Sequence, residues 1–291
     1  MKHHLHLHFI VLIWGFTAVL GALISLEAIP LVWFRMSLAA LVVLCYMWIR
    51  GIRFAVKVKF LWQMLGLGLA LALHWLTFFG AIKISNVSVT LSVMATGAFF
   101  AALLEPLIFS RPINWRELLL GLIAVVGLGI IFQASTEYMW GIVMALISAF
   151  LSALFSVFNG RLVQSHSASS ISFFELFFGV LGISIYLLFN GDFDASFFVL
   201  SFSDWTYLLI LSTICTAYAF IASVNLMKWL SPFTLMLTIN LEPVYGILLA
   251  LLVFGDSEYM SGMFYLGAGI ILATVLANAY FKAKASRNNP K

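Results

Sequence analysis

Apolar runs of about 20 residues recur along the chain and are separated by short polar segments. Each run is long enough to cross the roughly 30 Å hydrocarbon core of a bilayer as an α-helix. The pattern predicts an all-α integral membrane protein with ten transmembrane helices. These are expected at 5–26, 29–49, 60–82, 86–109, 117–133, 139–161, 170–190, 205–227, 231–254 and 261–281.

Composition supports a membrane setting. Hydrophobic residues make up 64% of the sequence and charged residues 9%, whereas an ordinary soluble domain carries about 25% charged residues. The net charge of +4 is explained by membrane topology and anionic lipid. No basic stretch interleaved with aromatic residues indicates a nucleic-acid partner.

Lysine and arginine residues indicate the orientation, because short cytoplasmic loops collect them. With a cytoplasmic N-terminus, the inside segments carry Lys2, Arg50, Arg53, Lys57, Lys59, Arg111, Arg116, Arg161, Lys228, Lys282, Lys284, Arg287 and Lys291. The outside segments carry Glu27, Glu137, Asp192, Asp194, Asp204, Asp256 and Glu258, with Lys83 as the basic exception. We therefore expect a multi-pass protein of the plasma or inner membrane with both termini in the cytoplasm.

Enzymatic and metal-binding motifs are not evident in the sequence. Cys45 and Cys215 fall within predicted spans and are interpreted as small packing residues. A histidine cluster (His3, His4, His6 and His8) lies at a membrane interface, which is a poor metal cage. The opening segment also resembles a signal peptide, but removing it would break the even helix count and the charge asymmetry. We expect no catalytic residue, no metal and no cofactor.

The chain contains an internal repeat. The segment "RELLLGLIAVVGLGIIF" resembles "MFYLGAGIILATVLANAYF", which places Gly121 on Gly267, 146 residues later. The same offset places Thr96 on Glu242. The predicted organisation is a first five-helix repeat at 5–133, a second at 139–281 and a basic cytoplasmic tail at 282–291. Because five is odd, the second repeat is inverted relative to the first.

These features together resemble the EamA-type branch of the drug/metabolite transporter superfamily. The resemblance rests on "LIWGFTA" (12–18), "WFRMSLAAL" (33–41) and "NLEPVYGILLALLVFGDSEYMSGMFYLGAGIIL" (240–272). Matched positions are Trp14, Gly15, Arg35, Glu242, Pro243, Glu258 and Gly267; Asp256 and Ser257 depart from the family pattern, in which Gly usually precedes Glu directly. The resemblance implies a basket of helices that holds its substrate centrally between two halves. It also implies transport of amino acids, sugars, nucleotide precursors or drugs.

Glu242 and Pro243 interrupt an apolar run that continues to Phe254. A carboxylate at mid-membrane costs at least about 2.5 kcal/mol. The proline frees a backbone carbonyl near Ile239, which is tolerated only beside protein or water. We therefore expect Glu242 to face a wet cavity, with Thr238 and Tyr245 on the same helix face. The alternative is a structural glutamate that is bonded to a neighbouring helix.

Further polar and aromatic residues at mid-depth complete the candidate substrate site. They are Trp14, His74, Trp75, Phe78, Thr96, Phe99, Asn159, Tyr218 and Asn225. Each aromatic residue alone also fits a packing role. His74 is the most informative of them, because imidazole changes charge near neutral pH and could share a coupling proton with Glu242.

Other charged residues within the predicted spans are given structural or gating roles, as is Pro243. Arg35 is expected near the outer end of its helix and Glu175 near the inner end of its own, so the two are not expected to pair. Each could extend its charge to its own interface. Arg35 could instead hold backbone carbonyls at helix ends, or steer substrate.

Glu105 repeats the Leu-Glu-Pro triplet of Glu242, but the 146-residue offset places it on Leu251. It lies near the cytoplasmic end of its helix, within reach of Arg111 and Arg116. We interpret it as an interfacial ion-pair or gate residue, and Glu117 similarly.

The function expected from these observations is secondary transport by alternating access. Export of amino acids or related amphipathic metabolites or drugs is the direction that the family resemblance favours. A nucleotide-sugar or sugar carrier is one alternative, although a phosphate needs buried cations and Arg35 is expected too near the outer face. A non-transporting membrane sensor or scaffold is the other. The expected partners are a small-molecule substrate and the lipid bilayer; the oligomeric state is left open.

Overall fold

The computed structural model describes residues 2–52, 57–112 and 115–288, and these form helices and connecting turns without any strand. The all-α prediction is confirmed for this part of the chain. Arg53, Lys291 and the side chains of Glu117, Lys282, Lys284 and Arg287 lie outside what is described.

The first half of the chain contains six helices. They are α1 (Lys2–Leu23), α2 (Ala28–Ile49), α3 (Val58–Ile84), α4 (Val87–Met94), α5 (Gly97–Phe109) and α6 (Trp115–Ala134). The second half contains α7 (Met139–Leu162), α8 (Ala168–Asn190), α9 (Phe202–Ser212), a π-helical segment (Thr213–Tyr218), α10 (Ala219–Leu226), α11 (Pro232–Ile239), α12 (Glu242–Phe254) and α13 (Gly262–Asn288). Short 3₁₀ turns lie at Thr136–Tyr138, Ser196–Phe198 and Gly255–Glu258.

Eight segments of the described chain are long and apolar enough to cross a membrane. Three of them join consecutive elements: α4 with α5, α9 with α10, and α11 with α12. Two further helices, α6 and α13, contain the shorter apolar stretches Leu119–Ala134 and Gly262–Thr274. The predicted total of ten crossings therefore depends on α6 and α13.

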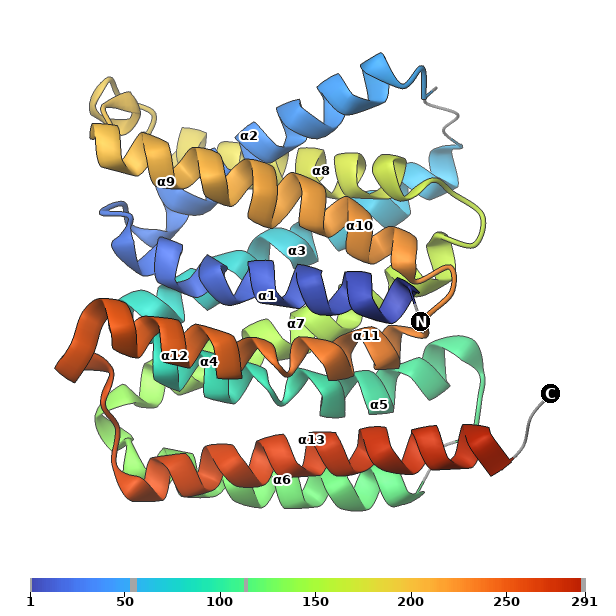
Figure 1. Cartoon of the computed structure of the whole chain (residues 1–291). Coiled ribbons are helices and arrows are strands. Elements are labelled where there is room, and N and C mark those ends of the chain that lie inside the picture. The colour runs from blue at the N-terminus through green and yellow to red at the C-terminus, as the bar shows by residue number, and fades with distance from the viewer. Residues whose placement is uncertain (1, 53–56, 113–114, 289–291) are drawn as a thin grey trace.

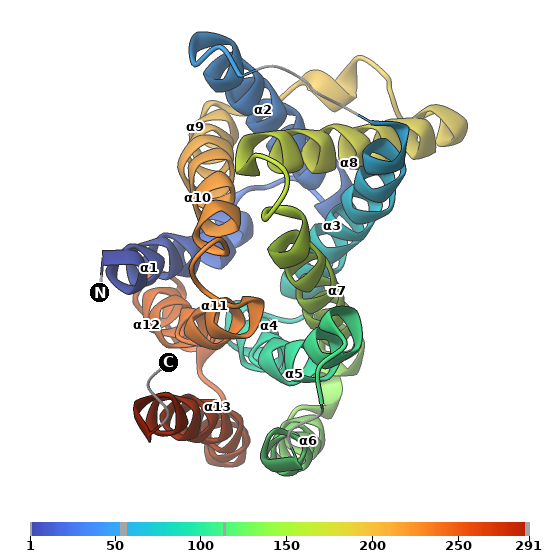
Figure 2. The ribbon, with the colours of Figure 1, turned by 90° about the vertical axis from the view of Figure 1, so that its right-hand side faces the viewer.

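The long helices run side by side, and the chain passes back and forth along the bundle (Figure 1). The start of α1 and the end of α13 lie at the same end of the molecule. Seen from that end, α6 and α13 form a pair beside the rest of the bundle (Figure 2), where α6 contacts α5 and α13 contacts α11.

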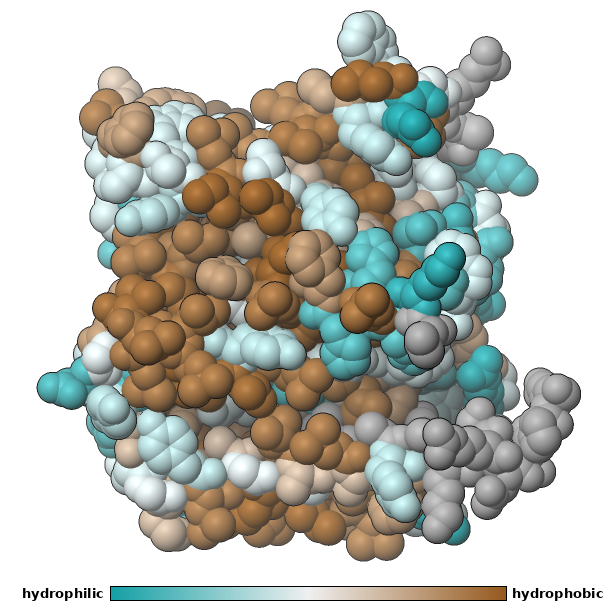
Figure 3. All heavy atoms as spheres, viewed as in Figure 1, coloured by the Kyte–Doolittle hydropathy of each residue, from teal (hydrophilic) through white to brown (hydrophobic). Residues whose placement is uncertain are grey.

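Apolar side chains cover most of the face shown in Figure 3, and hydrophilic residues gather toward the end that carries the start of α1. Large hydrophobic residues such as Trp48, Phe189 and Leu252 are more than 80% exposed. A surface of this kind fits contact with lipid hydrocarbon, in which apolar exposure carries no cost.

Two predicted spans are broken helices. In the span that contains Glu242, α11 ends at Ile239 and α12 begins at Glu242. This break confirms the interruption expected from Pro243. The span at 86–109 is also broken, between Met94 and Gly97, although it has no proline at that position. When the first break is shifted by the 146-residue offset of the repeat, it falls within one residue of the second break. Broken helices in corresponding positions of two inverted halves are a feature of transporter binding sites.

The α6–α13 pair is held by a close backbone approach of two glycines. A Cβ atom added to Gly267 would lie 2.7 Å from the carbonyl oxygen of Gly127, and one added to Gly127 would lie 2.9 Å from that of Gly267. Small residues at such crossings allow helices to pack closely within a membrane, where van der Waals contact drives association.

We expect Gly267→Val to separate α6 from α13 and to lower the free energy of unfolding by about 1–3 kcal/mol, which is typical of overpacking. Gly269→Val is the matched control, because a Cβ at Gly269 meets no atom within 4 Å. Thermal unfolding in detergent measures both variants. Equal melting temperatures for the two would contradict this account of the pair.

Candidate functional site

A cavity lies where the two halves of the chain meet, with lining residues from both. Its volume is about 80 Å³, which is room for several water-sized groups. The lining combines two charged groups, one imidazole, several hydroxyls and a large apolar and aromatic surface. These residues are Trp14, Thr17, Arg35, Leu71, His74, Trp75, Phe78, Met94, Ser152, Phe155, Ser156, Cys215, Phe220, Ser223, Met227, Leu235, Ile239 and Glu242.

Arg35 supplies the positive charge of the cavity. Its side chain is 2% exposed, and Cζ lies 4.1 Å from the centre of the Trp75 ring. Nε donates a hydrogen bond of 2.7 Å to the hydroxyl of Thr216. Of the alternatives left open for Arg35, extension of its charge to an interface is therefore not what the structure shows. The aromatic face and the hydroxyl on neighbouring helices hold the guanidinium inside, since both can replace part of its hydration.

The π-helical segment positions two residues of the site. The Thr216 hydroxyl donates to the carbonyl of Leu211, five residues earlier, while it accepts from Arg35. The carbonyl of Cys215 accepts a hydrogen bond of 3.1 Å from the indole nitrogen of Trp14. A π turn leaves backbone groups free for such contacts and is often found at functional sites.

Glu242 supplies the negative charge, and it is the first residue of α12. The side chain is half-buried and borders the cavity. Within the described part of the chain, no group donates a hydrogen bond to its carboxylate, and Arg35 forms no ion pair with it. The positive end of the α12 dipole lies beside the carboxylate and stabilises its charge. Glu242 is thus open toward the cavity.

His74 is held by Ser148 on α7. Nδ1 lies 2.8 Å from the Ser148 hydroxyl and 3.0 Å from the Ser148 carbonyl oxygen, and the hydroxyl donates to the His74 carbonyl. The Ser148 carbonyl can only accept, and the Ser148 hydroxyl is free to accept because its own hydrogen is directed to the His74 carbonyl. Nδ1 therefore carries the hydrogen in the neutral ring. Nε2 is then the ring atom that can take up a proton.

Five of the twelve residues predicted to bind substrate line the cavity: Trp14, His74, Trp75, Phe78 and Glu242. The structure places the others, which are Thr96, Phe99, Asn159, Tyr218, Asn225, Thr238 and Tyr245, outside this lining. The direction in which each side chain points was not readable from the sequence.

Several of these outlying residues have identifiable neighbours. The Phe99 ring covers Gly121 of α6, and Tyr245 packs against Gly15 of α1. The Tyr218 hydroxyl lies 2.9 Å from Nε2 of His6. The Thr96 and Thr238 hydroxyls donate to carbonyls of their own helical segments, at Val93 and Thr234.

Glu175 and Asn159 form a separate buried contact. Both residues are fully buried, and Nδ2 of Asn159 donates a hydrogen bond of 3.1 Å to Oε2 of Glu175. The possibility that Glu175 extends its charge to an interface is not what the structure shows, because its carboxylate is buried against the Asn159 amide. As predicted, Glu175 and Arg35 form no ion pair.

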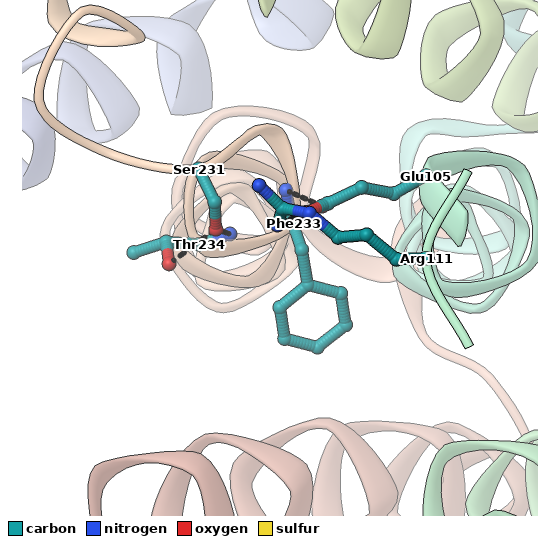
Figure 4. A network of polar contacts seen from close by, with 5 residues as sticks. All are labelled: Glu105, Arg111, Ser231, Phe233 and Thr234. Carbon is teal, nitrogen blue, oxygen red and sulfur yellow. Dashed lines mark hydrogen bonds and ion pairs between the residues drawn. The ribbon is translucent and has the colours of Figure 1, made fainter. Parts of the chain in front are cut away.

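Glu105 forms the predicted ion pair with Arg111, at 3.3 Å. Its other oxygen accepts a hydrogen bond of 2.9 Å from the backbone nitrogen of Phe233, in the first turn of α11 (Figure 4). This second contact was not predictable from the sequence.

Two lining residues that were not predicted, Ser152 and Ser156, belong to a sequence pattern that could have identified them. Together with Ser148 they recur every fourth residue along α7, which places three hydroxyls on one face of a helix inside a membrane. Such a polar stripe indicates an interior face. Phe155, Phe220 and Met227 could not have been distinguished from ordinary packing residues.

The comparisons with known proteins agree with this architecture. Residues 4–133 and 139–280 each match the model of the EamA-like transporter family. The chain belongs to this family, and it is a multi-pass membrane protein of a transporter class.

Among solved structures, 26 chains match. One of them, described only as "Crystal structure of protein", is similar with a TM-score of 0.69 and 17% identity over 94% of this chain and 95% of that one. This likeness concerns the fold alone. No curated protein matches the sequence.

We expect Thr216→Val to lower the free energy of unfolding by about 1–3 kcal/mol, because it leaves the Arg35 guanidinium short of a buried acceptor. Thr213→Val is the matched control in the same π segment, since the Thr213 hydroxyl bonds only to the Leu209 carbonyl of its own helical span. Unfolding of both variants in detergent is the measurement. A loss of similar size in the control would argue against a special role for the Arg35 contact.

Proposed function

We propose that the chain is a secondary transporter that moves zwitterionic amino acids or related amphipathic metabolites by alternating access. The observation that carries the proposal is the presence of Arg35 and Glu242 in one cavity without a direct ion pair. Arg35 fits a carboxylate, Glu242 fits an ammonium group, and the aromatic lining fits an apolar side chain.

Unpartnered polar atoms support a polar ligand. Within the described part of the chain, Nη1 of Arg35 and the hydroxyl of Thr17 are buried without a hydrogen-bond partner. Both residues border the cavity. Buried polar groups normally find partners, so a ligand or water with accepting atoms is expected there.

The broken helices support transport rather than simple binding. Met94 at the end of α4 and Glu242 at the start of α12 both border the cavity. A cavity of about 80 Å³ has to widen before a metabolite enters, since ligand pockets typically measure about 300–1,000 Å³. Half-helices can move separately at such breaks, which lets one half of the chain rock against the other.

A coupling proton is part of the proposal. Glu242 and His74 share the cavity, and Nε2 of His74 is the atom able to take up a proton. Exchange of substrate against a proton at one of these groups would drive net export.

A nucleotide-sugar carrier is the second candidate, because Arg35 lines the cavity and could meet a phosphate there. The carboxylate of Glu242 opposes this candidate, since it would repel a phosphate. Counterflow in proteoliposomes distinguishes the candidates: we expect exchange of neutral amino acids with apolar side chains and none of nucleotide sugars. Exchange of nucleotide sugars alone would favour the second candidate. No exchange of either would favour a sensor or scaffold.

We expect Glu242→Gln to reduce amino-acid exchange at least tenfold, equivalent to about 1.4 kcal/mol or more of barrier. The change keeps the shape of the side chain and removes its charge and proton site. Glu137→Gln, in an exposed turn, is the control and should transport normally. Exchange rates per folded molecule and melting temperatures are measured for both. A lowered melting temperature with unchanged exchange would indicate a structural glutamate.

The proposed orientation places ten crossings in the plasma or inner membrane with both termini in the cytoplasm. Most basic residues then lie on the cytoplasmic side. Lys83, the exception on the outer side, has a structural partner: its ammonium donates to the carbonyl of Ile24 at 2.5 Å, next to the end of α1. This contact accounts for a lysine where the charge rule disfavours one.

In a Cys45→Ala, Cys215→Ala background, we expect Lys59→Cys to react from the cytoplasmic side and Asp192→Cys from the outer side. Both positions are exposed, next to the start of α3 and the end of α8, which lie at opposite ends of the bundle (Figure 1). A membrane-impermeant maleimide applied to intact cells and to inverted vesicles gives the measurement. Reaction of both positions from one side would overturn the proposed topology.

A further inference from the structure

Two buried glutamates, one in each half of the chain, cap the start of a broken helix in the other half. Glu105 at the end of α5 accepts a hydrogen bond of 2.9 Å from the backbone nitrogen of Phe233 in α11 (Figure 4). Glu258, just after α12, accepts hydrogen bonds from the nitrogens of Val87 (3.0 Å) and Ser88 (2.8 Å) in α4. The two side chains thus serve the same purpose in reciprocal positions.

The two caps lie at opposite ends of the bundle. The broken spans α4–α5 and α11–α12 run antiparallel, with α5 against α11 at one end and α12 against α4 at the other (Figure 1). The Glu105 cap is at the end that carries both chain termini, and the Glu258 cap is at the far end. The cavity lies between them, beside the two helix breaks.

These caps depend on contact between the two broken spans. The first backbone N–H groups of a helix have no partner within that helix, and a carboxylate satisfies them with a charge that the helix dipole favours. Both helices also have a cap of their own, since Asn86 accepts from Val89 and Ser231 accepts from Thr234. The local cap moves with its helix, whereas the glutamate cap exists only while the two spans touch.

We propose that Glu105 and Glu258 are the latches of two gates, and that the transporter opens by releasing one of them while the other stays closed. In this structure both latches are formed, which in this proposal corresponds to an occluded state. Separation of α5 from α11 releases the Glu105 latch and admits water from the end that carries the termini. Separation of α4 from the turn at Glu258 opens the opposite end. The proposal rests on the transport function proposed above.

The latches differ in composition. One carboxylate oxygen of Glu105 accepts the hydrogen bond from Phe233, and the other forms the ion pair with Arg111, whose side chain is 62% exposed. Both carboxylate oxygens of Glu258 accept hydrogen bonds from backbone N–H groups of α4, and the residue is 4% exposed. A glutamine at position 105 can still offer its oxygen to Phe233, whereas one at position 258 has to face an N–H group with its amide nitrogen. The far gate is therefore the more sensitive to this substitution.

The test follows access to the cavity from each side, without substrate. Cys215 borders the cavity and serves as the reporter in a Cys45→Ala background, in membrane vesicles of known orientation. A membrane-impermeant maleimide is applied from either side. We expect Glu105→Gln to raise the labelling rate at least tenfold from the side of the termini only. Glu258→Gln should raise it by more than that from the opposite side only.

Two controls separate gating from stability. Ser231→Ala removes the local cap of α11 and should lower the melting temperature without a change in labelling from either side. Asp256→Asn, in the same turn as Glu258 but exposed, should change neither. Should a glutamine variant not fold, Glu105→Asp and Glu258→Asp retain the charge with shorter reach, and the same side-specific increase is expected of them.

The outcomes distinguish this proposal from the transport function. Side-specific labelling without amino-acid exchange would support the latches and reject the proposed substrate. Amino-acid exchange by the parent protein, combined with equal labelling from both sides in the two variants, would reject the latches and leave the transport function standing. Lower melting temperatures with unchanged labelling would show that both glutamates are structural caps only.

Discussion

Every backbone N–H and C=O group inside a bilayer has to find its hydrogen-bond partner within the protein, and the rest of this structure depends on that requirement. It explains why the described chain is helical throughout, since a helix satisfies its own backbone. It also makes each interruption informative. The two helix breaks and the π segment at Thr213–Tyr218 each place a residue at the cavity: Met94, Glu242 and Cys215. The irregular backbone and the polar interior therefore coincide.

The same requirement governs the buried charges. Arg35 is accommodated by the ring of Trp75 and the hydroxyl of Thr216, which replace part of its hydration shell. That hydroxyl is itself fixed by the π turn, because it donates to the Leu211 carbonyl. A local irregularity in one half of the chain thus holds a charge that belongs to the other half. The cavity and the packing between the halves depend on one another.

The sequence predicted the features that depend on the length of an apolar run or on a single residue with a strong conformational effect, such as proline. Apolar runs located the spans, and Pro243 located the break at Glu242. The break between α4 and α5 was not predictable, because no proline marks it and tertiary contacts with α12 and α7 hold it in place. The ion pair predicted for Glu105 was also correct, since Glu105 pairs with Arg111 near a helix end.

For the candidate site, the direction in which each side chain points was not predictable. His74 and Phe99 were both expected at mid-depth, yet one borders the cavity and the other covers Gly121. The rotation of a helix about its axis is set by packing against its neighbours, and apolar residues on all sides give a weak periodic signal. The interior position of Arg35 was missed for a related reason, since its partners lie on other helices.

The two halves contribute opposite charges to the cavity and not two equal ones. The 146-residue offset pairs Glu242 with Thr96, and the similar segments "IPLVWFRMSLAAL" and "SSISFFELFFGVL" pair Arg35 with Glu175. In each pair one member faces the cavity and the other does not: Glu175 bonds to Asn159, and the Thr96 hydroxyl bonds to the Val93 carbonyl. Each half therefore contributes one charge to the cavity, positive from the first half and negative from the second. The fold remains pseudosymmetric while its centre is polar, so a ligand with two opposite charges has one favoured orientation between the halves.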